Sequence, residues 1–418
     1  MIALESSADK HIATSDLRVN LERAVAGLDL NSKRVLVIIP DDTRSGPIDL
    51  FFKLLHELLG AQTAALDFMI ALGTHQPMSL PAICKHLRIE AGDLSDRYAE
   101  VRIFNHEWMV PDTLIRLGEI PAAEIAELSG GLFSESLPVA INRKIHDYDQ
   151  LIICGPVFPH EVAGFSGGNK YFFPGISGKE IIDFSHWLGA LLTSYEIIGT
   201  KHTPVRDIID RAAALIQKPK LCICYVVKDP DLKGLFVGNP EEAWSRAVDL
   251  SKTIHIHHVE RPFRRVLSVM PAMYKDLWTA AKGMYKLEPV VADDGELIIY
   301  APELKEISYS HGEIIDKIGY HTKGYFLTDW QKYRSYPWGV LAHSTHLRGR
   351  GEMVHGEEKP RIQVALATGI PEERCRQVGL GYMNPDRIVP AEWAHREHEG
   401  ILMVPKAGEI LYRLKDGG

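Results

Sequence analysis

Apolar runs of strand length alternate with amphipathic stretches along the first 260 residues. Four runs rich in β-branched and other bulky apolar residues predict buried strands: 34–40, 64–71, 151–155 and 221–227. Apolar residues at helical spacing predict helices between and beside them: 17–28, 48–59, parts of 188–217, and 240–257. In the helix at 48–59, Ser45 is the expected cap and Pro47 the first-turn proline. Alternating strands and helices predict a largely parallel, doubly wound α/β sheet.

The same alternation starts again after Pro262. Residues 265–271 and 295–301 predict strands, with a helix starting between them near Tyr274. Further strands are expected at 339–342 and 362–367, and the segment 343–351 is expected to be a cationic, Gly-rich loop. The chain therefore divides into two expected α/β domains, residues 1–263 and 264–418.

The composition is that of an ordinary globular protein, and it limits the classes of partner that are expected. With 418 residues, the chain is longer than one compact core usually is. The net charge is −8 and no basic stripe occurs, which makes nucleic acid an unexpected partner. We find neither a signal-peptide pattern nor an apolar run of membrane-spanning length, so a cytoplasmic protein with no membrane partner is expected. The five cysteines are scattered and form no Cys-x-x-Cys pair, which argues against a disulfide framework and a zinc ribbon.

Candidate chemistry gathers in residues 156–187, directly after the strand at 151–155. Five glycines there frame His160, Lys170 and His186, and loops at strand ends are where open α/β sheets bind ligands. A phosphate-binding P-loop is excluded by spacing, because Asn169 stands at its second glycine and Tyr171 at its hydroxyl position. Without a ligand, the stretch is still compatible with a plain structural loop.

Two other strand ends carry polar residues. Asp41, Thr43 and Arg44 follow the first strand, and His75 follows the second. Each has an ordinary explanation, since aspartates cap loops and helices and a single histidine at a strand end is commonly a loop residue.

Together these motifs resemble the lactate racemase family, whose members carry a nickel-pincer nucleotide tethered to a lysine. The likeness rests on four signatures in the same order. They are Asp41-x-Thr-Arg44, Gly73-x-His75, His160-x-x-Ala-Gly-Phe-Ser-Gly-Gly-x-Lys170 with Pro-Gly-Ile and His186 beyond it, and Trp278-Thr-Ala-Ala-Lys282. In the last signature the family has Tyr-Gln where this chain has Trp278 and Thr279.

The resemblance implies two α/β domains with the active site in the cleft between them, the first anchoring the cofactor and the second closing the site. It assigns catalysis to His75 and His160, the cofactor tether to Lys170, and nickel ligation to His186. Asp41, Thr43, Gly167 and Gly168 are the implied nucleotide contacts. Arg44 and Lys282 are the implied carboxylate ligands, with Trp278 and Thr279 lining the substrate pocket. Cofactor-synthesis proteins are the implied partners for maturation.

The implied reaction is inversion of C2 of a 2-hydroxy acid by proton-coupled hydride transfer through a 2-keto acid. The hydrogen on C2 is too weakly acidic for a side-chain base, and hydride transfer avoids the carbanion. Two histidines are needed because each enantiomer presents its hydroxyl group to a different one, and an imidazole can hold either proton state near pH 7.

A sugar acid of the aldonate type, epimerised at C2, is the expected substrate. The replacement of Tyr-Gln by Trp278 and Thr279 alters the pocket beside Lys282. Hydrogen-bond donors and a stacking face for hydroxyl groups are expected from His311, Trp338, His343, His346 and Arg348. Three alternatives stay open: a racemase of lactate or another small 2-hydroxy acid, a zinc hydrolase using His75, His160 and His186, and a non-catalytic sugar-acid binding protein.

Overall fold

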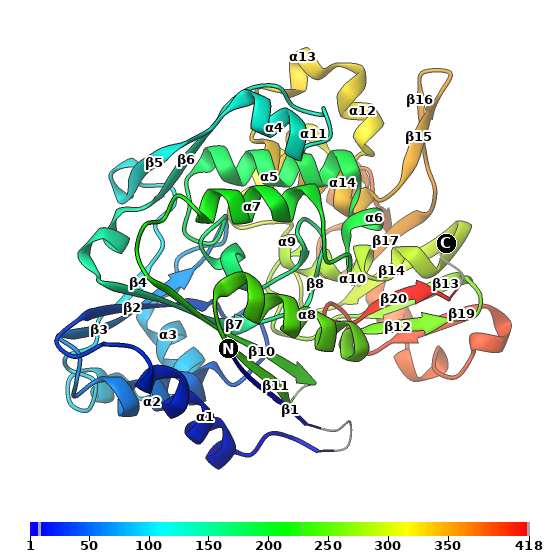
Figure 1. Cartoon of the computed structure of the whole chain (residues 1–418). Helices are drawn as coiled ribbons and strands as arrows, with labels where there is room; N and C mark the ends of the chain where they lie inside the picture. The colour runs from blue at the N-terminus through cyan, green and yellow to red at the C-terminus, as the bar shows by residue number, and fades with distance from the viewer. Residues whose placement is uncertain (7–9, 229, 416–418) are drawn as a thin grey trace. The chain divides into compact units, whose positions relative to one another are not determined.

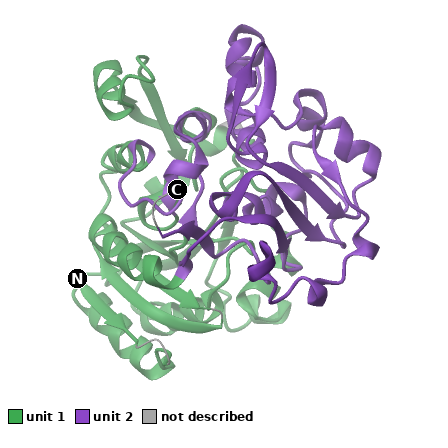
Figure 2. Cartoon of the chain, turned by 90° about the vertical axis from the view of Figure 1, so that its right-hand side faces the viewer, with its two compact units in different colours: residues 1–158, 166–182, 206–254 green, residues 159–165, 183–205, 255–418 purple. Residues whose placement is uncertain are grey.

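The computed structural model describes residues 1–6, 10–228 and 230–415 (Figure 1). The chain forms two compact units, coloured separately in Figure 2. Unit 1 contains residues 1–158, 166–182 and 206–254, and unit 2 contains residues 159–165, 183–205 and 255–418. The units interleave in sequence, whereas continuous domains divided at 263/264 were expected.

Unit 1 is built on a seven-stranded sheet of order β1-β11-β10-β7-β2-β3-β4. Its strands are β1 (Ile2–Glu5), β2 (Arg34–Pro40), β3 (Ala65–Ala71), β4 (Ile103–Asn105), β7 (Gln150–Pro156), β10 (Lys220–Lys228) and β11 (Asp231–Gly238). Strands β10, β7, β2, β3 and β4 are parallel, and β11 runs antiparallel to β1 and β10. The largely parallel sheet predicted from the alternating pattern is confirmed.

Helices cover both faces of this sheet (Figure 1). They are α1 (Thr14–Ala26), α2 (Ile48–Leu59), α3 (Leu80–Leu87), α7 (Pro204–Ala213) and α8 (Pro240–His255). Val35, Val37 and Ile39 of β2 belong to one buried core with α1, α2 and α3, because every second strand residue points to the same face. Helices α7 and α8 lie over the opposite face. A separate hairpin pairs β5 (Leu114–Ile120) with β6 (Leu137–Asn142), and α4 (Ala122–Leu128) lies between them in sequence.

Helix α2 begins with Pro47 at its N-cap, so Ser45 is not the cap as predicted. The turn before it is fixed by Gly46, which has φ 132° and passes the ring of Tyr225 so closely that an added Cβ would lie 2.6 Å from it. Packing against Tyr225 therefore sets the start of the helix. Helix α3 is capped by Ser79, whose Oγ accepts a hydrogen bond from the backbone N–H of Ala82.

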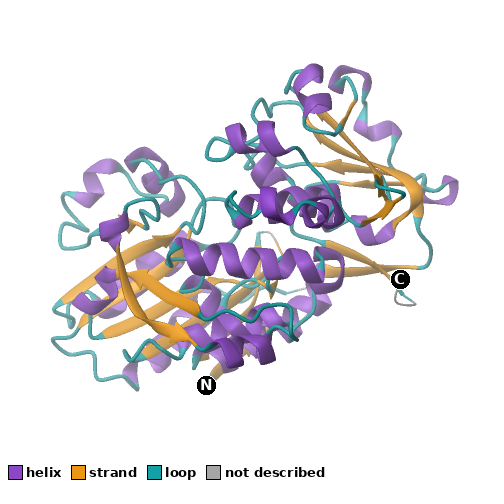
Figure 3. Ribbon diagram, turned by 90° about the horizontal axis from the view of Figure 1, so that it is seen from above, coloured by secondary structure: helices purple, strands orange, loops and turns teal. Residues whose placement is uncertain are grey.

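Unit 2 is built on a five-stranded parallel sheet of order β18-β17-β14-β13-β19, flanked by helices (Figure 3). Its strands are β13 (Phe263–Val269), β14 (Val291–Ala301), β17 (Gln363–Thr368), β18 (Gly381–Tyr382) and β19 (Ile401–Val404). Two smaller pairs join β12 (Ile256–Val259) to β20 (Leu411–Leu414) and β15 (Gly351–Val354) to β16 (Glu357–Pro360). Its helices beyond residue 255 are α9 (Leu277–Ala280), α10 (Lys282–Tyr285), α11 (Gly312–Ile318), α12 (Lys323–Thr328), α13 (Trp330–Tyr333), α14 (Trp338–Arg348) and α15 (Glu372–Gln377).

Two secondary-structure predictions were wrong. The segment expected as a strand at 339–342 followed by a loop is the helix α14, which ends at Gly349 with φ 82°. Residues 339–347 are all buried, and a segment that is buried all round lacks the periodicity that separates a helix from a strand. The stretch 156–187 is likewise not one loop. It contains β8 (Pro159–His160), β9 (Gly164–Phe165), a 3₁₀ turn at Gly168–Tyr171, and most of α5 (Lys179–Leu192), which is followed by α6 (Ser194–Ile197).

No helix in the described residues is both long enough and apolar enough to span a membrane.

Candidate functional site

The strand order of unit 1 creates a topological switch point between β2 and β7. From β2 the chain proceeds outward to β3 and β4, and from β7 it proceeds in the opposite direction to β10 and β11. Asp41 directly follows β2, and Pro156 ends β7, so both lie at the carboxyl edge of parallel neighbours. Open α/β sheets bind their ligands at this kind of position.

His75 is held by a carboxylate at this edge. Its Nδ1 lies 2.5 Å from Oδ2 of Asp41, which is only 5% exposed. The other carboxylate oxygen accepts hydrogen bonds from Thr43, at 2.7 Å from Oγ1 and 3.2 Å from the backbone N. The indole N–H of Trp108 donates to the carbonyl oxygen of His75. Asp41 therefore keeps a proton on Nδ1, which leaves Nε2 of His75 as the basic nitrogen.

The segment that carries Lys170 is shaped by a tryptophan of α8. Gly167 and Gly168 have φ values of 87° and 59°, and a Cβ on Gly168 would lie 2.9 Å from Cβ of Trp244. The indole N–H of Trp244 donates to the carbonyl oxygen of Ser166, at 2.9 Å. The two glycines thus admit the protein's own indole, and their predicted contact with the nucleotide stays a prediction. Lys170 is half-buried in the 3₁₀ turn.

Buried polar residues of α7 hold the same segment. The guanidinium of Arg206 lies 4.0 Å from the centre of the Trp244 ring, and its Nη1 donates to the carbonyl oxygen of Gly167 at 3.4 Å. Burial lowers the pKa of Arg206, and the neighbouring Asp210 opposes that shift. Asn169 Nδ2 in turn donates to Asp210, at 3.0 Å. Sequence spacing gave no sign of these contacts, because they join residues about 40 to 80 positions apart in the chain.

Three predicted segments meet in unit 1. The backbone N–H of Gly73 donates to the carbonyl oxygen of Gly175 at 3.0 Å, which joins the His75 loop to the Lys170 segment. Burial raises the pKa of Tyr171 well above its usual value, and the nearby charges of Arg44 and Asp41 act on it in opposite directions. The residues that follow β2 and β3 therefore lie near the segment that bears Lys170.

His160 and His186 belong to unit 2. His160, in β8, is buried, and its Nδ1 accepts a hydrogen bond from the backbone N–H of Val162 at 3.1 Å. In the neutral ring the proton is therefore on Nε2, which is the opposite tautomer to that of His75. A carboxylate oxygen of Glu161 lies 3.5 Å from Nδ1. His186 is half-buried on α5.

The predicted substrate residues of unit 2 lie near buried aromatic rings. Trp278 stacks on His343 with ring centres 3.9 Å apart, and Nε2 of His343 donates to the Trp278 carbonyl oxygen. Thr279 uses its hydroxyl group within the helix, donating to Asp276 Oδ1 at 2.8 Å. The Nζ of Lys282, which is 4% exposed, lies 4.9 Å from the ring centre of Tyr274.

The residues expected to contact the hydroxyl groups of a sugar acid differ from one another in their surroundings. His311 packs against Trp278 with ring centres 4.5 Å apart. Trp338 and Arg348 donate to the carbonyl oxygens of Arg334 and Gly379. Burial lowers the pKa of His343 to about 3 and that of His346 to about 4, so both rings are neutral at pH 7. Among the described residues, no three His, Cys, Asp or Glu side chains are grouped so as to hold a metal ion.

The family model for the lactate racemase N-terminal domain matches residues 20–197. The lactate racemases of Thermoanaerobacterium thermosaccharolyticum and Lactiplantibacillus plantarum are each 26% identical to this chain, over 289 and 269 residues. Residues 20–197 of this chain therefore belong to the lactate racemase N-terminal domain family. The matches cover 67% and 61% of this chain but only 61% and 53% of those two proteins.

Two solved structures are similar to this protein over nearly its whole length. A crystal structure of a protein from Thermotoga maritima superposes with a TM-score of 0.90 at 32% identity, covering 99% of this chain and 100% of that one. The lactate racemase apoprotein of T. thermosaccharolyticum superposes with a TM-score of 0.71 at 18% identity, covering 96% of this chain and 93% of that chain. The second likeness confirms the α/β fold.

Proposed function

We propose that this chain is an isomerase that inverts C2 of a 2-hydroxy acid by proton-coupled hydride transfer through a 2-keto acid. The observation that carries the proposal is the Asp41–His75 pair beside the Lys170 segment at the switch point of unit 1. A histidine fixed by a buried carboxylate is a base for a hydroxyl proton. A lysine at the place where α/β sheets bind nucleotides suits the tethered cofactor of the family.

The residues present fit a nickel-pincer nucleotide. Lys170 is half-buried beside the carboxyl ends of β2 and β7, so its amine can carry a covalent attachment at the nucleotide position. His186 would supply an imidazole, which is a good ligand for nickel. The bound group would supply the hydride acceptor that no side chain provides. Its attachment would need the cofactor-synthesis proteins expected for this family.

The two catalytic histidines start in complementary proton states. His75 presents an unprotonated Nε2, which can take the proton of the substrate hydroxyl group. His160 presents Nε2–H, which can return a proton to the carbonyl oxygen of the 2-keto acid. One turnover exchanges these states, and the reverse reaction restores them. Asp41 stabilises the imidazolium that forms on His75.

Carboxylate binding is assigned to Arg44 and Lys282, Arg44 through its planar guanidinium and Lys282 through a buried ammonium. The proposed substrate is an aldonate. Thr279 does not support this choice directly, since its hydroxyl group already binds Asp276. The support comes from Trp278, whose broad ring is held by His343 and His311 and can stack on the substrate chain.

A spectrum and metal analysis of protein made with the cofactor-synthesis proteins test the proposal. Nickel together with a visible chromophore and C2 epimerisation is the expected result. Zinc without a chromophore would favour the hydrolase, and neither metal nor turnover would favour a binding protein. His186→Ala is expected to lose nickel while keeping the covalent adduct on Lys170. Assays with lactate, malate, phenyllactate and a panel of aldonates identify the substrate, and efficient turnover of lactate alone would overturn the aldonate assignment.

A further inference from the structure

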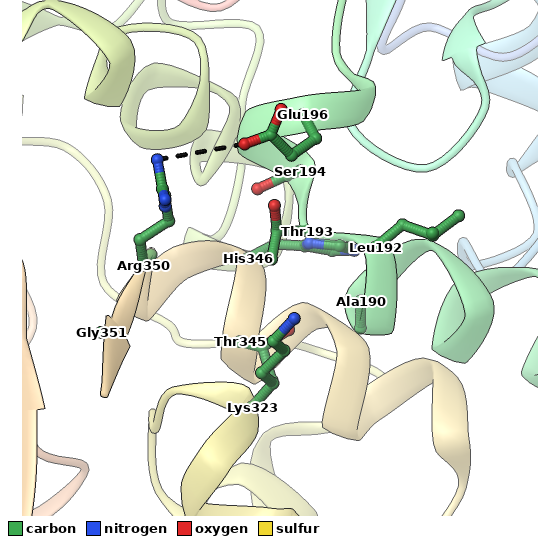
Figure 4. A pocket seen from close by; sticks show the side chains of 11 residues that line it. Ala190, Leu192, Thr193, Ser194, Glu196, Lys323, Thr345, His346, Arg350 and Gly351 are labelled. Carbon is green, nitrogen blue, oxygen red and sulfur yellow. Dashed lines mark ion pairs between the residues drawn. The ribbon is translucent and has the colours of Figure 1, made fainter. Parts of the chain in front are cut away.

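A cavity of about 270 Å³ lies inside unit 2, lined by residues of α5 and α6 and of α12 and α14, with the turns that follow α5 and α14 (Figure 4). Its polar lining includes Thr193, Glu196, Lys323, His346 and Arg350. Every one of its lining residues belongs to unit 2. Of these lining residues, only His346 was expected from the sequence to contact the substrate.

Two cations share this cavity. The ammonium of Lys323 is half-buried and donates to the carbonyl oxygen of Leu191 at 2.7 Å, which fixes its position. Burial lowers the pKa of Lys323, the charge of Arg350 lowers it further, and Glu196 opposes both. The guanidinium of Arg350 lies 4.4 Å from the ring centre of Tyr195. Two repelling cations in a half-buried cavity are an unfavourable arrangement that a bound anion relieves.

A single exposed carboxylate partly balances the two cations. Oε1 of Glu196 lies 4.0 Å from Nη1 of Arg350, the ion pair marked in Figure 4. The side chain of Glu196 is 64% exposed, so water screens its charge. One screened carboxylate against two cations leaves the lining residues with a net positive charge, although the buried Glu288, outside the lining, accepts a hydrogen bond from the backbone N–H of Arg350.

Two residues of the lining also carry buried polar atoms. Nε2 of His346 has no hydrogen-bond partner among the described residues, and this residue is 3% exposed. Oγ1 of Thr193 is also buried and unpaired within that part of the chain. A buried polar group without a partner costs about 1–3 kcal/mol. Thr193 also has φ 75°, a left-handed conformation that is strained for a β-branched residue.

We propose that this cavity binds an anionic oxygen group, either a phosphate or a carboxylate. Lys323 and Arg350 supply the charge, and His346 and Thr193 supply hydrogen bonds. A neutral chain of hydroxyl groups could satisfy the two unpaired atoms but would leave the repulsion between the cations uncompensated. The observations therefore favour an anion.

Helix α5 connects this cavity to the proposed reaction. It carries His186 and, one turn later, the lining residue Ala190, within the same unit. The following step rests on the proposed function. The 2-hydroxy acid then carries a second anionic group, as in an aldarate or a phosphorylated aldonate.

Calorimetric titration of the full chain without cofactor tests the site directly. The probes are inorganic phosphate and glutarate, a dicarboxylate with no 2-hydroxyl group, at ionic strength held constant with chloride. Lys323→Met and Arg350→Gln are each expected to weaken binding of the preferred probe by about tenfold or more. Glu196→Gln removes a competing carboxylate and is expected to tighten binding about two- to fivefold. Arg376→Gln, a matched charge change on the exposed helix α15, should leave the affinity unchanged.

A specific anion site predicts that Lys323→Met and Arg350→Gln weaken binding and that Glu196→Gln tightens it. A general effect of net charge would also change the affinity in Arg376→Gln. Equal affinities in the wild type, Lys323→Met and Glu196→Gln would overturn the proposal, as would the absence of binding by both probes in a folded wild-type chain. The preferred probe decides between phosphate and carboxylate. Melting temperatures of all variants establish that the chain is folded.

Turnover by the holo-protein separates this inference from the proposed function. Lys323→Met is expected to raise KM for an aldarate or a phosphorylated aldonate at unchanged kcat, and to leave KM for the plain aldonate unchanged. Anion binding without turnover of any 2-hydroxy acid would leave the site standing and remove the proposed function. Turnover without anion binding would support the proposed function and overturn the anion site.

Discussion

The two units hold their candidate functional residues in different ways. In unit 1 the residues lie on loops at strand ends, where His75 is oriented by Asp41 and the Lys170 segment is held by Trp244. In unit 2 most of them lie on helices, and His343 and Trp278 are stacked inside a buried aromatic group. Unit 1 therefore holds its polar residues on ordered loops, whereas unit 2 holds them among packed aromatic rings.

This difference suggests a division of labour. Residues 20–197, which match the family model, include the strand-end motifs of unit 1. The chain departs from the family's Tyr-Gln pair at Trp278 and Thr279, and it places the cationic cavity in the same unit. We accordingly propose that unit 1 carries the cofactor lysine and His75, and that unit 2 adds His160 and His186 and selects the substrate. The predictions below test this division.

The largest effect is expected from Lys170→Ala. Without the amine no covalent adduct can form, so intact-mass analysis should show the unmodified chain and activity should be lost. Lys179→Ala, which removes an exposed lysine at the start of α5, is the matched control and should keep both. An adduct that persists in Lys170→Ala would place the tether elsewhere.

The next effect is expected from Asp41→Asn. The amide cannot hold the Nδ1 proton of His75 in the same way, so the wrong tautomer faces the substrate. We expect kcat to fall roughly 10²–10⁴-fold in both directions while the adduct mass is unchanged. His75→Ala and His160→Ala should each block interconversion in both directions. Normal turnover in any of the three variants would remove that residue from the mechanism.

Much of unit 1 was predictable because local signals and tertiary structure agree there. Continuous apolar runs gave β2, β3, β7 and β10 within about two residues. The strand-end rule then led to the Asp41, His75 and Lys170 segments, which the structure joins. The roles assigned to those residues stay predictions that the variants above test.

The features that the sequence did not predict depend on packing between segments that are distant in the chain. The glycines at 167 and 168 were expected to approach a ligand, but Val157 comes closest to Gly167, and Trp244, from a helix more than 70 residues later, comes closest to Gly168. Helix α14 was taken for a strand and a loop because its buried residues show no polar face. The cationic cavity joins α5 and α6 to α12 and α14, and no local pattern brings segments so distant in sequence together.

A smaller effect is expected from Trp244→Phe. Phenylalanine fills most of the same space, but it cannot donate to the Ser166 carbonyl oxygen and stacks less strongly on Arg206. We expect a loss of about 1–3 kcal/mol in the free energy of unfolding, measured by urea denaturation. Trp393→Phe, whose ring faces Arg265 in unit 2, is the control for a more exposed stack and should lose less. An equal loss in both variants would contradict a special role for Trp244.

The smallest effect concerns the dependence of stability on pH. Burial lowers the pKa of His106 to about 4, in unit 1, and those of His343 and His346 to about 3 and 4, in unit 2. Below pH 6.5 the unfolded chain binds protons that the folded chain does not, so stability falls with pH until the folded-state pKa values are reached. Each group contributes at most about 1.4 kcal/mol per pH unit. His343→Phe keeps the stack on Trp278 and should reduce this slope by about that amount between pH 6 and pH 4.5, whereas an unchanged slope would contradict the assignment.

The fate of deuterium at C2 tests the proposed reaction most directly. Holo-protein is incubated with a sugar acid deuterated at C2 in ordinary water, and mass spectrometry follows both the substrate and its epimer. Because the hydrogen leaves as a hydride and returns to the same carbon, we predict that the product epimer keeps its deuterium. Complete loss of the label to solvent within the first turnover would contradict hydride return and would indicate proton abstraction from C2.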